Sequence, residues 1–384
     1  MIIYLGWFFA SVILCLTTLK ASRSTQVLLM TFFMMALGIF VGLGDMLGGY
    51  DRYIYGEIFD SMADVTNSGG NPLMSNSFAF YGNEFGYGAY SALMTYITAN
   101  RYIYIFITTL FIYVFLIISL RKYAENMPFA IILFLGLWFF FTFTYLRQVL
   151  ACAIVWLAVQ YIIERDLKKY LLVCLIAYSF HNSVLIFVPV YFLPMKKYAH
   201  NKVIMLMVIA LLIGLTPIPQ ALFALYGDVN ADRISVGSYA EDAGFRFAYL
   251  IESVFFIWLI LTNYSRISET RRDVVLLNLA IIFCAILLIF IRSENGGRLG
   301  WVFMIGVICT ITKICVNNKR IVKQGVFIII ICLFLYLRIY NSWQRYLNLY
   351  PYKTFMTNGY REGDYSWEHY EYDHNYDIDK FYRK

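Results

Sequence analysis

The chain has 384 residues, of which 61% are hydrophobic and only 14% are charged, with a formal net charge of +7. Soluble domains carry about 25% charged residues, so the composition excludes an ordinary soluble protein. It indicates an all-α polytopic membrane protein, because isolated strands cannot satisfy their backbone hydrogen bonds in lipid. The positive charge is typical of loops that set membrane orientation. No basic patch with interleaved aromatic residues occurs, so we expect no nucleic-acid partner.

Ten apolar segments are candidate transmembrane helices, given that about 20 helical residues cross a bilayer core. They cover residues 2–19, 26–43, 102–120, 128–144, 148–163, 203–219, 247–264, 274–291, 299–315 and 325–340. We therefore predict a single transmembrane domain over 1–340, followed by a polar, tyrosine-rich tail over 341–384. The seven cysteines lie in apolar segments without disulfide or metal-ligand spacing, and we expect them to fill the core.

One apolar run, from Pro128 to Ile163, is too long for a single crossing and is interrupted by Arg147 and Gln148. It predicts two helices that meet near Tyr145, with the arginine at the start of the second. A permanent cation is costly there and indicates a functional site. Beside the free backbone N–H groups of a helix N-terminus, it makes a site for phosphate.

Segment 170–194 is predicted to enter and leave the membrane on the same side. Only that path places all six basic turns in the cytoplasm, as the positive-inside rule requires. These turns carry Lys20 and Arg23; Arg121 and Lys122; Arg165, Lys168 and Lys169; Lys196, Lys197 and Lys202; Arg266, Arg271 and Arg272; and Lys313, Lys319, Arg320 and Lys323. His181 divides the segment into halves too short to span, which predicts a re-entrant helix pair with His181 near its tip.

The resulting topology puts both termini and the unusual polar residues outside. The outer face then has a long loop (44–101), in which stretches 53–65 and 86–99 could lie in the membrane interface. It also has a medium loop (220–246) and the turn Arg292–Arg298. The candidate site residues are Asp45, Tyr50, Asp51, Glu84, Arg147, Gln148, His181, Arg292, Glu294 and Arg298.

Two of these arginines, Arg147 and Arg298, could together hold a pyrophosphate. The imidazole of His181 suits a general base near neutral pH. The alternatives are structural. Arg147 could be an interfacial anchor, His181 could cap a helix break, and Asp45 could be a helix cap or loop carboxylate. No cluster has metal-ligand spacing, so we expect neither a metal nor a cofactor.

Several of these patches resemble the EpsG-type, Wzy-like polysaccharide polymerases. The Arg-Gln-x-x-Ala helix is matched by Arg147, Gln148 and Ala151, and the Phe-His-x-Ser stretch by Phe180, His181 and Ser183. The family's Gly-x-Asp…Tyr loop is similar to Gly44, Asp45 and Tyr50, and its Glu-x-Gly-Phe/Tyr helix to Glu84, Gly86 and Tyr87. The stretch GGRLGW resembles the part of the pattern that holds the later family arginine, here Arg298. The matching patches span roughly residues 40 to 195, and the last 40 or so residues match no pattern.

The resemblance implies a GT-C-like fold and glycosyl transfer at the periplasmic or outer side of a bacterial cytoplasmic membrane. Oligosaccharide units on undecaprenyl pyrophosphate are joined, without a metal, as arginines stabilise the leaving group. His181, Arg147 and Asp45 would be catalytic. Substrate binding would fall to Arg298, Arg292, Gln148, Glu84, Tyr50, Asp51 and Glu294. The implied partners are the lipid-linked oligosaccharide, membrane lipid, a flippase and a chain-length regulator.

The sequence also allows three other functions. An O-antigen ligase uses the same leaving group and a similar set of residues, although the Phe-His patch favours the polymerase. A membrane O-acyltransferase would need a histidine near the first helices, and none precedes His181. A transporter for the lipid-linked glycan should show internal repeats and charges at mid-membrane, whereas here the charges gather at one face.

Overall fold

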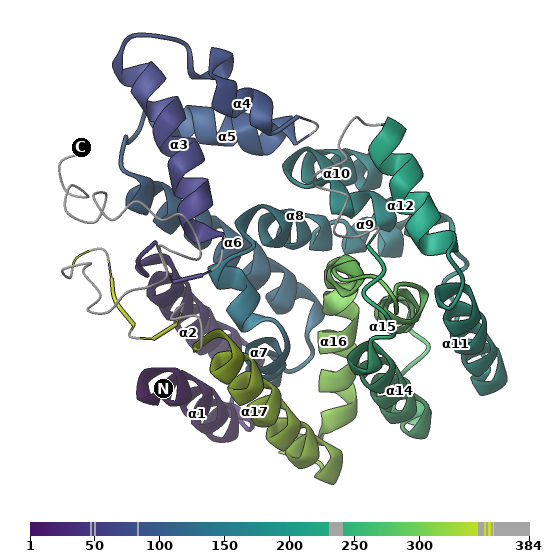
Figure 1. Ribbon diagram of the computed structural model, residues 1–384. Helices are drawn as coiled ribbons and strands as arrows, with labels where there is room; N and C mark the ends of the chain where they lie inside the picture. Colours follow the sequence, from purple (N-terminus) through teal and green to yellow (C-terminus); the bar gives the residue numbers. More distant parts are fainter. Residues whose placement is uncertain are drawn as a thin grey trace.

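The computed structural model of the protein describes residues 1–46, 48–49, 51–82, 84–229, 241–344, 349–350, 352–354 and 356. Within these residues the chain is a bundle of helices with one two-stranded hairpin (Figure 1). Its elements, in order, are α1 (Ile2–Thr18), α2 (Arg23–Gly42), α3 (Arg52–Asn67), η1 (Pro72–Met74), α4 (Asn76–Phe80), α5 (Phe85–Thr95), α6 (Arg101–Tyr123), α7 (Met127–Leu137), η2 (Phe139–Phe143), α8 (Leu146–Trp156), α9 (Val159–Glu164), α10 (Leu167–Phe180), η3 (Asn182–Phe192), α11 (His200–Gly214), α12 (Ile218–Val229), α14 (Phe247–Thr262), η4 (Tyr264–Arg266), α15 (Arg271–Ile289), η5 (Gly296–Phe303), α16 (Met304–Cys315), β1 (Val316–Asn317), β2 (Arg320–Ile321) and α17 (Lys323–Gln344), where η marks a 3₁₀ helix.

The prediction of a polytopic all-α membrane protein is confirmed. Six helical segments in the described part of the chain are long and apolar enough to cross a membrane, and a seventh span results if α11 and α12 count as one bent helix. Each of the ten predicted spans falls on helix, but α1, α7 and α14 are shorter apolar helices. The number of crossings therefore stays a prediction. The predicted loop 220–246 begins with α12, which turns by 67° from α11.

The segment after Glu164 doubles back on itself, as the re-entrant prediction requires. The Tyr170 hydroxyl near the start of α10 donates to the Phe187 carbonyl in η3 at 2.5 Å, and its ring lies 5.1 Å from that of Tyr191. The Arg165 guanidinium donates to the Tyr191 carbonyl at 3.0 Å. Both ends of the segment therefore lie together, with His181 at the opposite tip. Entry into the membrane stays a prediction.

Hydrogen bonds from cations to backbone carbonyls join the basic turns into one end of the bundle. Arg23 donates to the Glu125 carbonyl in the turn after α6 at 3.1 Å, and Arg272 donates to the Tyr123 carbonyl at 2.5 Å. Lys197 bonds to Ile267, Arg266 to Ile314, and Lys319 to Lys20. We call this region, made of the turns at 18–25, 121–126, 164–169, 193–200, 262–273 and 313–323, the basic end. The six turns share one end of the bundle, which the prediction requires.

The opposite end carries the long loop 44–101, which is largely helical. The stretches predicted for the membrane interface are largely α3 and α5, and these two helices lie with α4 at the upper left of Figure 1. A buried ion pair ties this layer to the bundle, since the Nε of Arg101 at the start of α6 donates to Asp60 of α3 at 2.7 Å. A charge pair at 6% and 7% exposure fixes the orientation of α3, because separating it would leave two buried ions.

The core lies where α7, α8 and η5 meet. The rings of Trp138 and Trp156 stack with centroids 5.0 Å apart, and the Trp156 indole N–H donates to the Val302 carbonyl at 3.1 Å. All seven cysteines are buried and free, which confirms their predicted place in the core. The first part of the tail returns to this bundle, where Tyr352 stacks on Phe40 of α2 at 4.3 Å. The predicted character of residues 357–384 lies outside the described residues.

Candidate functional site

The start of α8 is held in place by the loop that follows α2. The backbone N–H of Asp51 donates to the Thr144 hydroxyl at 2.8 Å. A Cβ on Gly49 would lie 2.6 Å from the Phe143 carbonyl oxygen, so this close approach requires glycine. These contacts place Asp51 beside the first turn of α8, which begins at Leu146 and carries Arg147.

Arg147 forms an ion pair with Glu84, and Glu84 also reaches the tip of the doubled-back segment. The Arg147 Nη1 donates to Glu84 Oε2 at 2.5 Å, and the other carboxylate oxygen accepts from the Asn182 backbone N–H at 3.2 Å. The Arg147 guanidinium carbon lies 5.6 Å and 5.9 Å from the ring centroids of Tyr55 and Tyr81. Its side chain is 24% exposed, so Arg147 is paired yet open to a ligand.

Close packing of α5 against α10 carries Glu84 to this position. A Cβ on Gly86 would lie 2.1 Å from the Ser179 hydroxyl and 3.0 Å from its carbonyl oxygen. The absence of a side chain at Gly86 therefore allows the two helices to approach. A side chain at position 86 would push α5 away from α10. The Glu84 carboxylate would then move away from Arg147.

His181 is brought into the same cluster, but its ring is oriented against the role of general base. Its Nδ1 accepts the Ser183 backbone N–H at 3.1 Å. The proton of the neutral ring is therefore assigned to Nε2, and this nitrogen lies 3.8 Å from Glu84 Oε1. A base needs an open lone pair, whereas here one nitrogen already accepts and the other carries hydrogen. The geometry favours His181 as a donor toward Glu84.

Gln148 links the second arginine to the first. Its Oε1 accepts from Arg298 Nε at 3.0 Å, while its Nε2 lies within bonding distance of the Arg298 carbonyl and of the Ser183 hydroxyl. The Arg298 guanidinium also lies 4.2 Å from the ring centroid of Tyr145. Because Gln148 directly follows Arg147 in the helix, its hydrogen bonds hold the turn that carries Arg298 next to the N-terminus of α8.

Asp51 adds a carboxylate that interacts electrostatically with Arg147 and Arg298. Its position at the start of α3 involves no side-chain capping bond, so its carboxylate is not used by that helix. Burial raises the pKa of the Asp51 carboxyl above its ordinary value, and the positive charges of Arg298 and Arg147 oppose that rise. The contact with Thr144 places Asp51 beside the first turn of α8, so the two guanidiniums are positioned to act on its carboxyl group.

Two of the predicted site residues are engaged elsewhere. Arg292 forms a paired contact with the Asp242 carboxylate, with one bond from Nε at 3.2 Å and a second from Nη2. Glu294 is exposed and faces Arg246 at 3.9 Å. Both contacts belong to the junction between residues 241–246 and the end of α15. The structure thus shows no contact of Arg292 or Glu294 with Arg147 or Arg298 among the described residues, and their substrate-binding roles stay predictions.

Asp45 lies in the interior, away from the contacts that define the cluster. It is 3% exposed, and its backbone N–H donates to the Lys353 carbonyl. Burial lowers the pKa of the neighbouring Arg52 to about 10, and Asp45 opposes that lowering. The geometry therefore favours the alternative of a structural carboxylate for Asp45 and gives no support to a catalytic one. Tyr50 lies outside the described residues.

The sequence did not predict which aromatic residues lie next to the two arginines. Tyr55 and Tyr81 flank Arg147, while Tyr145 and Trp301 flank Arg298. Tyr145, two residues before Arg147, and Trp301, three residues after Arg298 in η5, had a signal in their spacing. Tyr55 and Tyr81 come from separate segments, and only the fold brings them to Arg147. No group of three or more His, Cys, Asp or Glu arranged for a metal occurs in the described part of the chain, and metal independence stays a prediction.

Comparison with known proteins places the chain in a family. The model of the EpsG family matches residues 27–354. The chain therefore belongs to the EpsG family, a family of Wzy-like polysaccharide polymerases. No curated protein and no solved structure gave a match. The matched region includes every residue of the cluster described above.

Proposed function

We propose that this member of the EpsG family is a polysaccharide polymerase that acts on undecaprenyl-pyrophosphate-linked oligosaccharides. The observation that carries the proposal is the junction of Arg147, Gln148 and Arg298 at the mouth of α8. Two guanidiniums at one site match a pyrophosphate, because each can offer parallel N–H donors to phosphate oxygens. Fixed cations also stabilise the charge that develops on such a leaving group.

The reaction joins two lipid-linked units. An acceptor sugar hydroxyl attacks C1 of the reducing-end sugar on the donor. The new C1–O glycosidic bond forms while the bond from C1 to the pyrophosphate oxygen breaks, and the electron pair leaves with the pyrophosphate. The acceptor's proton must pass to a base.

Asp51 is the base in this proposal. It lies within electrostatic reach of both arginines, and its side chain is not used to cap α3. A carboxylate beside bound pyrophosphate is well placed to take a proton from a hydroxyl that approaches the same sugar carbon. His181 and Glu84 then act as positioning residues, because Glu84 holds the Arg147 guanidinium and His181 directs its Nε2 toward Glu84.

We also propose that the site faces outward from a bacterial cytoplasmic membrane, with the basic end in the cytoplasm. The shared location of the six basic turns supports this orientation through the positive-inside rule. A cysteine at position 197, in an otherwise cysteine-free chain, should resist a membrane-impermeant thiol reagent applied to intact cells. Labelling from outside would contradict the orientation.

Deletion of the gene in its host tests the function itself. We expect loss of polymeric surface glycan with single repeat units retained, seen on gels of the surface glycan. Accumulation of free lipid-linked polymer would instead indicate a ligase. Accumulation of units in the cytoplasm would indicate a transporter. An unchanged chain-length distribution with loss of an acyl substituent would indicate an acyltransferase.

A further inference from the structure

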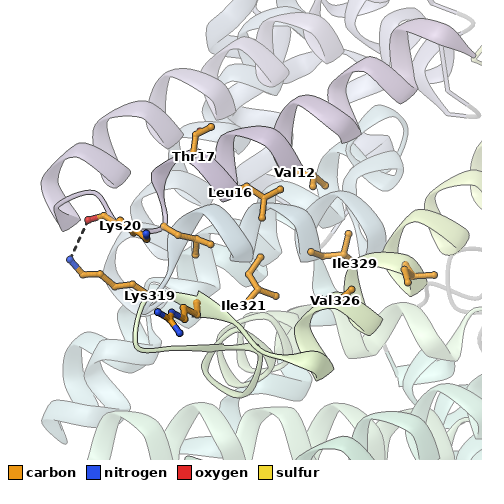
Figure 2. A pocket seen from close by; sticks show the side chains of 11 residues that line it. Val12, Leu16, Thr17, Lys20, Lys319, Ile321, Val326 and Ile329 are labelled. Carbon is orange, nitrogen blue, oxygen red and sulfur yellow. Dashed lines mark hydrogen bonds between the residues drawn. The ribbon is translucent and has the colours of Figure 1, made fainter.

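A groove of about 780 Å³ opens between α1 and the start of α17, at the basic end (Figure 2). Apolar side chains from both helices form its walls, among them Leu16 of α1 and Val326 and Ile330 of α17. These three are more than half exposed, at 56%, 52% and 60%. Such a surface is open to the side of the bundle, where a spanning helix meets lipid.

The helices α1 and α17 contact each other on one side of the groove. Toward the site end, the Tyr336 hydroxyl donates to the Tyr4 carbonyl at 2.9 Å, and the rings of Phe8 and Tyr336 lie 5.3 Å apart. At the basic end, the hairpin of β1 and β2 leads into α17, and its Lys319 bonds to the carbonyl of Lys20, which follows α1. Between them, α1 and α17 leave an apolar gap that no side chain of the described chain fills.

Three cations stand at one end of this gap. Lys20, Lys319 and Arg320 line the groove and are all exposed, and the Lys319 ammonium donates to the Lys20 carbonyl at 3.3 Å (Figure 2). In the part of the chain that the structure describes, none of the three has a carboxylate within ion-pair distance. The cluster thus holds three positive charges without an anion from the protein.

Both residues of the hairpin turn, including Lys319, have a left-handed backbone conformation. Asn318 and Lys319 have φ angles of 46° and 59°, as a two-residue turn of this hairpin requires. Asparagine tolerates the left-handed region, but a lysine there is uncommon. A glycine would make the turn more easily, so the turn geometry does not explain why position 319 carries an ammonium.

We propose that the groove binds one anionic phospholipid of the membrane. Its phosphate lies among Lys20, Lys319 and Arg320, and an acyl chain lies between α1 and α17. Charge complementarity selects this occupant, because basic pockets between spanning helices take anionic headgroups while the apolar walls suit acyl chains. The proposal depends on the membrane location of the chain but not on the polymerase activity, since the site lies at the opposite end from Arg147.

Native mass spectrometry of the full-length protein in detergent tests this site with phosphatidylglycerol. The charge variant combines Lys20→Gln, Lys319→Gly and Arg320→Gln, and the glycine preserves the left-handed turn. Each cation near a phosphate contributes about 5-fold in affinity, so we expect a loss of about 100-fold. The matched control removes three exposed cations from other basic turns, through Lys168→Gln, Lys202→Gln and Arg271→Gln, and should bind phosphatidylglycerol almost as the wild type does.

A second variant tests the apolar walls of the groove independently of its charges. Leu16→Trp fills the groove while it retains all three cations, and it should also weaken phosphatidylglycerol binding. Phosphatidylcholine with the same chains should bind the wild type at least 10-fold more weakly. Equal binding of the two lipids, or an unchanged affinity in the charge variant, would overturn the proposal. Inorganic phosphate that binds as tightly as the lipid would show a simple anion site and would also overturn it.

Discussion

The two site arginines use different acceptors from the cations that link most of the basic turns. Lys313 is an exception at the basic end, because it pairs with Asp273. At the basic end, Arg266, Arg272 and Lys197 donate to backbone carbonyls, with distances of 2.9, 2.5 and 2.7 Å. At the site end, Arg147 meets a carboxylate and Arg298 a side-chain amide. Carbonyls near helix C-termini are acceptors that any nearby cation can satisfy. Side-chain acceptors instead fix the direction of a guanidinium fork, which is what recognition of an anion needs.

The exposure of a cation is a poor guide to its role in this protein. Arg165 at the basic end is exposed and closes the doubled-back segment, whereas the half-buried Arg147 keeps part of its surface open to ligands. Changes at the site end should therefore affect polymer formation more than matched changes at the basic end or on the bundle surface.

The largest effect is expected from loss of the proposed base. Asp51→Asn keeps the size of the side chain but cannot accept the proton, and removal of a general base costs about 10²–10⁴-fold in rate. His181→Gln, which preserves a donor near Glu84, should cost much less. Polymer formation at equal expression in a deletion strain measures both. If the His181 variant is the inactive one and the Asp51 variant is active, the two assignments must be exchanged.

The pH dependence of the same activity sharpens this assignment. Because burial raises the pKa of Asp51, activity should fall as the pH decreases through a value above the ordinary aspartate value of about 4. Arg298 stabilises the carboxylate form, so Arg298→Gln should move this acid limb to higher pH. A membrane assay of the residual activity measures the limb. An acid limb that persists in Asp51→Asn would assign it to another group.

Arg147→Lys should have the next largest effect. An ammonium keeps the charge but loses the planar fork that holds two phosphate oxygens, and loss of one preorganised donor costs about 10²–10³-fold in rate. Arg165→Lys at the basic end is the matched control and should leave polymer formation intact. Near wild-type polymer from the Arg147 variant would make that residue an anchor.

A smaller effect is expected from Gly86→Ala. The new methyl group would press against Ser179 and move α5 away from α10, which shifts Glu84 relative to Arg147. A displacement of about 1 Å can cost about 10²-fold, and partial relaxation should reduce that loss. Gly6→Ala is the control, since nothing lies within 4 Å of a Cβ there. Equal polymer from both variants would show that α5 does not set the position of Glu84.

The smallest effect is expected from Arg165→Gln at the basic end. It weakens the bond to the Tyr191 carbonyl, and because this side chain is exposed, the loss should be about 1 kcal/mol of stability. Thermal unfolding of the purified protein measures the loss, and polymer formation should be unchanged. A complete loss of polymer with normal stability would give the basic end a role in the reaction.

The apolar runs and the charges were enough to predict a helical membrane protein, the doubled-back segment and part of the cluster at its tip. The basic turns predicted that the ends of segment 170–194 lie together, because only one path collects the cations on one side. Arg147 was conspicuous because a cation is costly in an apolar run. Asp45 and Arg292 were equally conspicuous as polar residues near helix ends, yet the sequence does not show which partner such a residue finds.

The sequence by itself determined that the chain is a helical membrane protein, and it singled out polar residues near breaks in the apolar runs as candidates for a site. These properties follow from the free energy of placing apolar and charged groups in lipid, which depends on residue type and order. Only the tertiary structure decided that Glu84 pairs with Arg147 and that Arg298 reaches Gln148. It also decided which nitrogen of His181 is occupied and that a groove separates α1 from α17. Those properties depend on the approach of segments far apart in the chain, such as α5 to α10 at Gly86, which packing alone sets.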